Sequence, residues 1–126
     1  VLPTGARLDA AVFARWPLVS QPAGAGTTRL IDAWLRAQRV PEVRRIDCNA
    51  WGAVAGMLVE GLGVGILPEL WARALAAEGR LVLPAARPAL AGLPYAVHWR
   101  RDDTRPLIAA LQAEVATAVD FAAARY

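Results

Sequence analysis

The residues that could carry chemistry are few and scattered. His98 and Cys48 are the only histidine and cysteine among 126 residues, so we expect no cluster of metal ligands. Ser20 does not stand in a G-x-S-x-G turn, and nothing in the sequence ties His98 to it as a general base. Asp102 and Asp103 are adjacent, which suits a helix start better than an acid and base pair. The sequence therefore predicts that the protein is not an enzyme.

Three glycines alternate with apolar residues in the stretch V-E-G-L-G-V-G-I-L-P-E, residues 59–69. A dinucleotide loop needs glycine at the sixth position of G-x-G-x-x-G, where Ile66 stands, and it follows a strand, whereas these glycines precede one. The chain also has no lysine to complete a P-loop. We expect Gly61 to cap a helix at positive φ, and Gly63 and Gly65 to allow close backbone packing. No cofactor is expected.

Four polar side chains follow predicted strands where these lead into helices. The four are Ser20, Gln21, Thr27 and Asn49. In open α/β sheets, ligands bind beyond the carboxyl ends of strands, and the free N–H groups of helix N-termini favour an anion or carboxylate there. If the two strands are neighbours, the four side chains converge on a site for an anionic small molecule. Alternatively, Thr27 and Asn49 only cap their helices.

Short apolar runs alternate with amphipathic segments along the chain. This pattern predicts an α/β fold with a mostly parallel sheet flanked by helices. The predicted strands are near 17–20, 43–48, 64–67, 80–84 and 95–100. The predicted helices are near 9–15, 27–39, 50–60, 68–78 and 105–124. In the second of these helices, Asp32 and Arg36 are four residues apart and could pair weakly.

Composition sets further bounds on the class of protein. A hydrophobic fraction of 56% suffices for a real core, and no run of about 18 apolar residues predicts a membrane span. We see no signal peptide. The net charge is +3, but the arginines are scattered along the chain, whereas a nucleic-acid-binding protein would concentrate its basic residues in one stripe. A single cysteine allows no internal disulfide and fits a reducing, cytoplasmic compartment.

Residues 59–69 also resemble a family signature. They look like the V-x-x-G-x-G-x-x-x-L-P-E segment in the effector-binding domain of LysR-type transcriptional regulators. Residues 16–35 resemble the P-hydrophobic-hydrophobic…G-x-x-x-[RT]-x-x-hydrophobic segment of that family, and residues 47–69 its central motif. Residues 81–111 are similar to its C-terminal strand and helix. Together these stretches cover nearly the whole chain, and their order and spacing are the specific part.

The resemblance implies a periplasmic-binding-protein-like (type 2) fold, in which an inducer or co-inducer binds between two α/β subdomains joined by crossing strands. Residues 1–92 would be effector-binding subdomain II, and residues 93–126 the C-terminal strand and helix of subdomain I. The winged helix-turn-helix and the first part of subdomain I are missing, so this domain would be partial and would contact DNA only through the missing N-terminal domain. By resemblance, Ser20 and Gln21 match a polar loop, and Asn49 a polar helix start, that face the cleft.

The expected function is therefore the small-molecule sensing portion of a LysR-type bacterial regulator. The alternative is part of a periplasmic-type solute-binding protein, and the sequence upstream would decide between a winged helix-turn-helix and a signal peptide. Strand 95–100 and helix 105–124 are each apolar on one face. An apolar strand with open edges is a template for another chain, so we expect a homo-oligomer and no membrane association.

Overall fold

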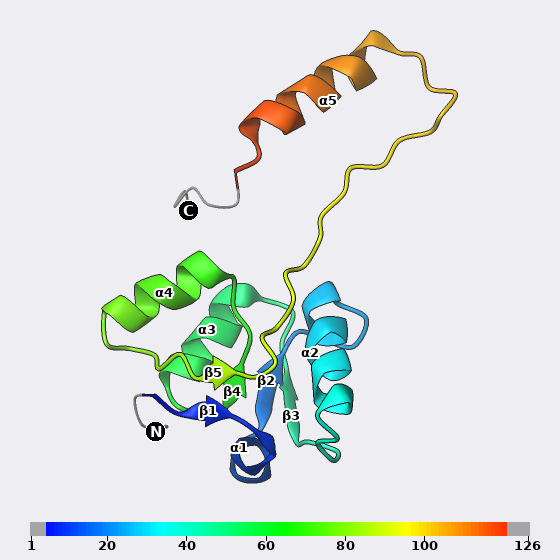
Figure 1. The fold of residues 1–126 in the computed structure, drawn as a ribbon. Coiled ribbons are helices and arrows are strands. Elements are labelled where there is room, and N and C mark those ends of the chain that lie inside the picture. Colours follow the sequence, from blue (N-terminus) through cyan, green and yellow to red (C-terminus); the bar gives the residue numbers. More distant parts are fainter. Residues whose placement is uncertain (1–4, 121–126) are drawn as a thin grey trace. The chain divides into compact units, whose positions relative to one another are not determined.

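The structure is a computed structural model that describes residues 5–120 (Figure 1). The chain divides into two compact units, Val1–Leu93 and Pro94–Tyr126. In order, the elements are β1 (Arg7–Leu8), α1 (Ala10–Arg15), β2 (Leu18–Ser20), α2 (Gly26–Ala37), β3 (Arg45–Asp47), α3 (Trp51–Val59), β4 (Val64–Gly65), α4 (Glu69–Ala77), β5 (Ala85–Ala86) and α5 (Pro106–Ala118). All but α5 belong to the first unit.

The first unit is built on a three-stranded parallel sheet in the order β3-β2-β4. Helix α2 connects the central strand β2 to β3, and α3 then carries the chain across to β4 on the other side of β2. A second, two-stranded parallel pair joins β1 to β5. The predicted α/β class with a mostly parallel sheet is therefore confirmed.

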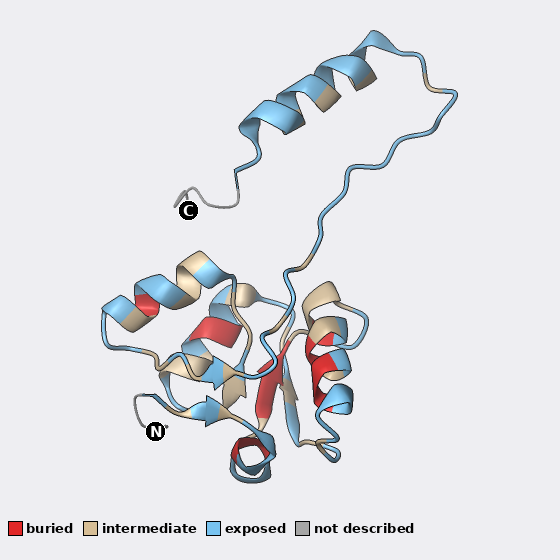
Figure 2. Cartoon of the chain, in the orientation of Figure 1, coloured by how far each residue is buried: buried red, intermediate tan, exposed pale blue. Residues whose placement is uncertain are grey.

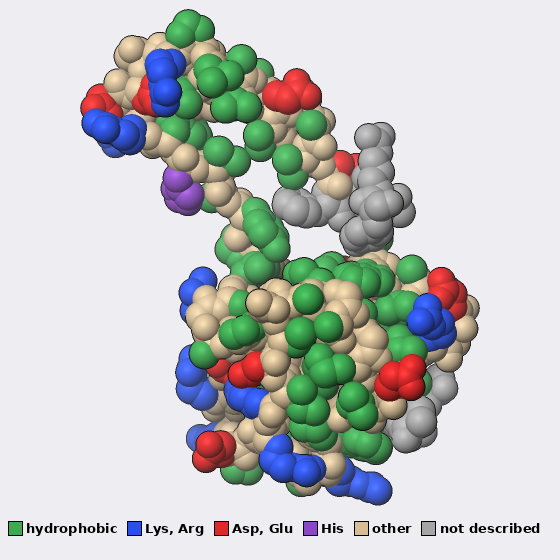
Figure 3. Space-filling view, turned by 180° about the vertical axis from the view of Figure 1, so that it is seen from behind, with side chains coloured by type: hydrophobic (Ala, Val, Ile, Leu, Met, Phe, Trp, Pro, Cys, Tyr) green, Lys and Arg blue, Asp and Glu red, His purple; other side chains and the backbone are tan. Residues whose placement is uncertain are grey.

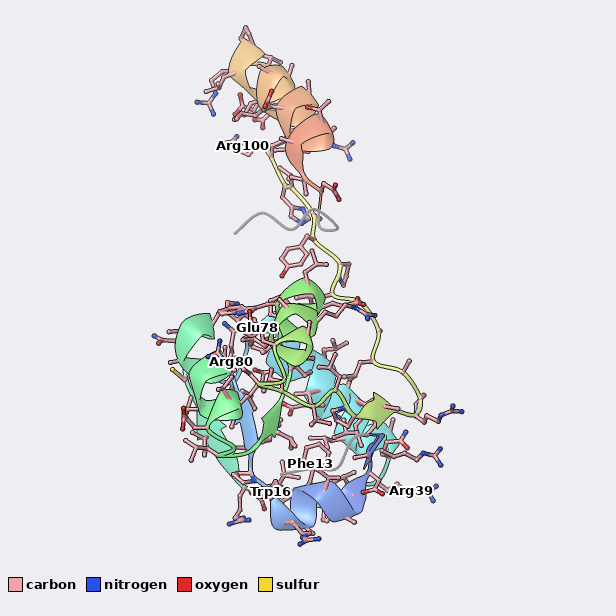
Figure 4. The ribbon with its side chains drawn as sticks, turned by 90° about the vertical axis from the view of Figure 1, so that its left-hand side faces the viewer. Phe13, Trp16, Arg39, Glu78, Arg80 and Arg100 are labelled. Atoms are coloured by element: carbon pink, nitrogen blue, oxygen red, sulfur yellow. The ribbon has the colours of Figure 1, made fainter. Side chains whose placement is uncertain are left out.

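The core lies on both faces of β2, where buried residues gather in Figure 2. Leu18 packs with Phe13 of α1 and with the buried face of α2, which comprises Ile31, Trp34 and Leu35. The rings of Phe13 and Trp34 are 6.4 Å apart between centroids, and Figure 4 shows Phe13 on the side of α1 that faces the rest of the unit. Val19 points to the opposite face because strand side chains alternate, and it is fully buried.

Glycine ends helix α3 as the sequence predicts. Gly61 has a φ of +72°, its N–H donates to the carbonyl of Leu58, and the N–H of Leu62 donates to the carbonyl of Met57. These two bonds define a Schellman motif, which satisfies the last carbonyls of the helix. Helix α2 ends with the same pair of bonds, but there the residue at positive φ is Arg39, with a φ of +54°.

Gly63 and Gly65 allow β4 to approach β2 closely. A Cβ at Gly63 would lie 2.4 Å from the carbonyl oxygen of Pro17, and one at Gly65 would lie 2.4 Å from that of Val19. Any side chain would collide there, since Cβ atoms do not approach an oxygen within 3.0 Å. The predicted packing role of these two glycines is confirmed.

Two predicted strands are wrong. Residues 80–84 form no strand, and the short strand β5 lies just beyond them at Ala85–Ala86. The turn that ends α4 and the missing N–H of Pro84 leave this run too short to pair. Residues 95–100 alternate as a strand should, but they form no strand, because alternation by itself supplies no partner for ladder bonds.

The last helix is shorter than predicted, because α5 ends at Ala118, and residues 121–124 lie outside the described part of the chain. On its apolar face no residue is buried: Leu107 and Leu111 are 61% and 50% exposed, while Ile108 and Val115 are half-buried. Figure 3 shows hydrophobic side chains over much of the second unit. Among the described residues, no helix has the length and apolar character needed to cross a membrane.

Candidate functional site

The candidate site begins where β2 and β3 end side by side. These strands pair in parallel with Ser20 opposite Asp47, so the condition on which the site was predicted, that the two strands are neighbours, is met. The Ser20 hydroxyl donates a hydrogen bond of 3.0 Å to Oδ1 of Asp47, and the N–H of Cys48 donates to the Ser20 carbonyl at 2.9 Å. The carboxyl ends of two strands thus carry a fixed hydroxyl and an exposed carboxylate.

The first turn of α2 is fastened to the loop that follows β2. The hydroxyl of Thr27 donates to Oε1 of Gln21 at 2.9 Å, and the hydroxyl of Thr28 donates to the Gln21 carbonyl at 2.7 Å. The residue at the N-cap is Ala25, which offers no side-chain acceptor. No side chain therefore caps the first N–H groups of α2, which form the positive end of the helix dipole.

A small hollow lies between these groups, with a volume of about 10 Å³, room for one water molecule. Its polar lining is Ser20, Gln21, Thr27 and Thr28, and its apolar lining is Leu18, Ile31, Trp51 and Ile66. Ser20 and Thr28 are the two buried polar side chains in the part of the chain that the structure describes. Buried polar groups are uncommon and informative, and here both face one hollow.

The structure brings three of the four predicted site residues together, namely Ser20, Gln21 and Thr27. Asn49 is exposed and does not line the hollow. The alternative, that Thr27 and Asn49 cap their helices, is wrong for both residues, because the N-caps of α2 and α3 are Ala25 and Ala50 and no side chain caps either helix. Helix α3 starts one residue later than the sequence suggested, which moves the Asn49 side chain out of capping position.

Sequence reasoning missed Thr28, Trp51 and Ile66 as lining residues. Thr28 lies in the first turn of α2 beside the predicted site residue Thr27, and its hydroxyl donates to the Gln21 carbonyl. The signal for Trp51 was available, since a large aromatic stands three residues after the end of the predicted strand 43–48. Ile66 follows β4, the third strand of the sheet, and only the strand order β3-β2-β4 brings it to the same edge.

A larger groove of about 640 Å³ lies at the opposite ends of the strands, beside the turn from α2 to β3. Its charged residues are Asp32, Arg36, Glu42, Arg44 and Arg45. Asp32 pairs with Arg45, and not with Arg36 as the helical spacing suggested. Ligands of parallel sheets bind at carboxyl ends, so this groove is the weaker candidate.

The described residues hold no group of three or more His, Cys, Asp or Glu side chains placed to bind a metal ion. Two carboxyl groups whose pKa is lowered, Asp102 and Asp103, lie in the second unit and not at the hollow. The Arg105 side chain holds the pKa of Asp103 below its usual value, and that of Arg100 does the same for the pKa of Asp102. Both carboxyls are paired with exposed arginines, so they do not form an acid and base pair.

A parallel α/β sheet with hydrogen-bonded polar groups at its carboxyl edge is typical of domains that bind small molecules. A family model described as "LysR substrate binding domain" matches residues 2–120. The chain belongs to this family, whose fold is the periplasmic-binding-protein type, and it is the effector-sensing part of a LysR-type transcriptional regulator. No curated protein and no solved structure matches the chain. The family resemblance inferred from residues 16–111 is confirmed.

Proposed function

We propose that the first turn of α2 and the end of β2 bind one end of the effector. The observation that carries this proposal is that the two buried polar side chains, Ser20 and Thr28, both line one hollow at the carboxyl edge of the sheet. Gln21 and Thr27 complete the polar lining. Asn49 is exposed and does not line the hollow, so it would contact a ligand only where the ligand extends beyond the hollow.

The charges around the hollow favour an orientation for an anionic effector. The uncapped N-terminus of α2 attracts a carboxylate, whereas Asp47 beside Ser20 repels one. An acid group would therefore lie toward Thr27 and Thr28, and a neutral or donor group toward Asp47. Trp51 and Ile66 offer apolar surface to the part between.

The domain assignment is also a proposal. Residues 1–92 would be effector-binding subdomain II, and residues 93–126 the C-terminal strand and helix of subdomain I. The division of the chain after Leu93 supports this assignment. The remaining wall of the effector cleft would come from the rest of subdomain I. DNA would be contacted only through a separate N-terminal domain, in a cytoplasmic regulator that catalyses no reaction.

The effector site is tested with a panel of small carboxylic acids and their amide counterparts, by thermal shift. We expect an acid, but not its amide, to raise the melting temperature, because a ligand that binds only the folded state stabilises it. Thr27→Val and Gln21→Ala should each reduce that shift, while Gly56→Ala on the open surface of α3 should not. An acid that stabilises all four proteins equally binds elsewhere and contradicts the proposal.

Oligomerisation is proposed from the second unit. Tyr95, Val97, Trp99, Leu107, Leu111 and Val119 are each about half exposed or more. A surface of this kind on one unit marks a contact with another chain. We expect sedimentation velocity to show a dimer or larger species. A stable monomer at high protein concentration would contradict this expectation.

A further inference from the structure

The segment that leads out of the first unit lies along helix α2. We call residues 85–93 the connector, because they run from β5 to Pro94, where the second unit begins. The indole N–H of Trp34 on α2 donates a hydrogen bond of 2.7 Å to the carbonyl of Pro88. Leu90 packs against the buried cluster to which Trp34 belongs. The connector is thus held to α2 by a partly buried hydrogen bond and by apolar contact.

The end of the connector reaches the first turn of α2. A Cβ at Gly26, the first residue of that helix, would lie 3.1 Å and 3.2 Å from the two methyl groups of Leu93. Gly26 does not have a positive φ, so its backbone does not require glycine. A side chain at this position would instead press on the Leu93 methyl groups, which would have to move by a few tenths of an ångström.

The same turn of α2 faces the candidate site. Successive helix residues point about 100° apart, so Gly26 faces Leu93 while its neighbours face other partners. Thr27 and Thr28 donate hydrogen bonds to Gln21 and line the hollow. One helical turn is consequently in contact with the polar end of the site on one side and with the connector on the other.

We propose that the first turn of α2 and the connector form one mechanical element, which relays contact at the hollow to the segment entering the second unit. A change at Thr28 shifts the turn, the turn shifts Leu93, and the Pro88 carbonyl moves relative to the Trp34 indole. The inference rests on the proposed function only where it takes the effector to be the molecule that contacts the first turn of α2. Coupling of this kind is a free energy and is measurable without a ligand.

The test measures hydrogen exchange of the Trp34 indole N–H by NMR in the whole chain, with Trp34→Phe to assign its signal. The indole exchanges when the Pro88 carbonyl leaves it, so its rate reports detachment of the connector. Gly26→Ala presses on Leu93, and Thr28→Val removes the bond to Gln21. We expect both variants to raise the exchange rate at least about threefold.

Two controls separate coupling from general loss of stability. Gly52→Ala makes the same change in the first turn of α3, where a Cβ meets nothing within 4 Å, and it should leave the rate unchanged. Leu75→Ala truncates a buried residue of α4 outside the Trp34 cluster. The proposal is overturned if Thr28→Val leaves the rate at the wild-type value. The unfolding free energies of Leu75→Ala and Gly26→Ala are matched by adjusting the urea concentration. The proposal is equally overturned if, at matched stability, Leu75→Ala accelerates indole exchange as much as Gly26→Ala does.

This experiment uses no effector. Failure of every carboxylate to bind would contradict the proposed function and leave the exchange result standing. Unchanged exchange would contradict the relay and leave ligand binding at the hollow untouched. The two hypotheses therefore fail separately.

Discussion

Replacing Gly63 by alanine tests the closest approach in the sheet. The new Cβ would lie 2.4 Å from the carbonyl oxygen of Pro17 and 2.9 Å from Cγ2 of Val19. Bringing the first contact to 3.0 Å requires the strands to separate by about 0.6 Å. The bond from the N–H of Val64 to the same Pro17 oxygen is 3.0 Å long, and that separation would stretch it to about 3.6 Å, beyond hydrogen-bond range.

The expected loss of stability follows from these two effects. Overpacking a close contact costs about 1–3 kcal/mol, and a lost hydrogen bond adds about 1 kcal/mol. We expect Gly63→Ala to lower the free energy of unfolding by roughly 2–4 kcal/mol, a large share of the 5–15 kcal/mol of a typical domain. The measurement is urea unfolding followed by tryptophan fluorescence and far-ultraviolet circular dichroism.

The matched control is Gly56→Ala, the same substitution on the exposed side of α3. A Cβ there meets nothing within 4 Å, and alanine stabilises a helix interior by about 0.5–1 kcal/mol relative to glycine. The two variants should therefore change stability in opposite directions. If Gly63→Ala unfolds within about 1 kcal/mol of the wild type, the strands can part freely and the reasoning is wrong.

Three further predictions concern single side chains. Arg39→Gly should raise the unfolding free energy by about 0.5–1 kcal/mol, because glycine tolerates the positive φ that ends α2; a loss of stability in urea unfolding would refute this. Asp32→Ala should cost at most about 1 kcal/mol and less in high salt, because its ion pair with Arg45 is about one third exposed; a salt-independent cost would contradict the ion-pair origin. Arg105→Ala should raise the pKa of Asp103 toward its ordinary value in a carboxyl-carbon NMR titration. Because the pKa of Asp103 is lowered in the folded chain, its ion pair with Arg105 stabilises the fold above the ordinary pKa, and this stabilisation is lost as the pH falls through the lowered pKa. An unchanged pKa of Asp103 in Arg105→Ala would refute the assignment.

The sequence was a good guide wherever the deciding interaction is local. A helix end followed by glycine requires only a few residues, and Gly61 accordingly ends α3 at positive φ. The apolar face of α2 follows from helical spacing: Ile31, Trp34 and Leu35 stand three and four residues apart along the helix, and all three are buried. The polar residues after β2 were found because a strand end leading into a helix is recognisable from a short stretch.

The errors lie where pairing over a distance decides. Residues 95–100 have the alternation of a strand, but alternation supplies no pairing partner, and they form no strand. Asp32 has a helical neighbour at the right spacing, yet it pairs with Arg45, which the parallel sheet brings close. Asn49 has the right residue type for a cap, but the helix begins one residue too late for it.

By itself the sequence determined the α/β class, the family and the polar character of the strand ends, because these depend on residue types at short separations. Only the tertiary structure decided which polar groups share one hollow. Ser20, Trp51 and Ile66 come together because β2 is the centre of the sheet and its neighbours are parallel. Strand order is set by packing between segments that are tens of residues apart, and that packing leaves no local mark in the chain.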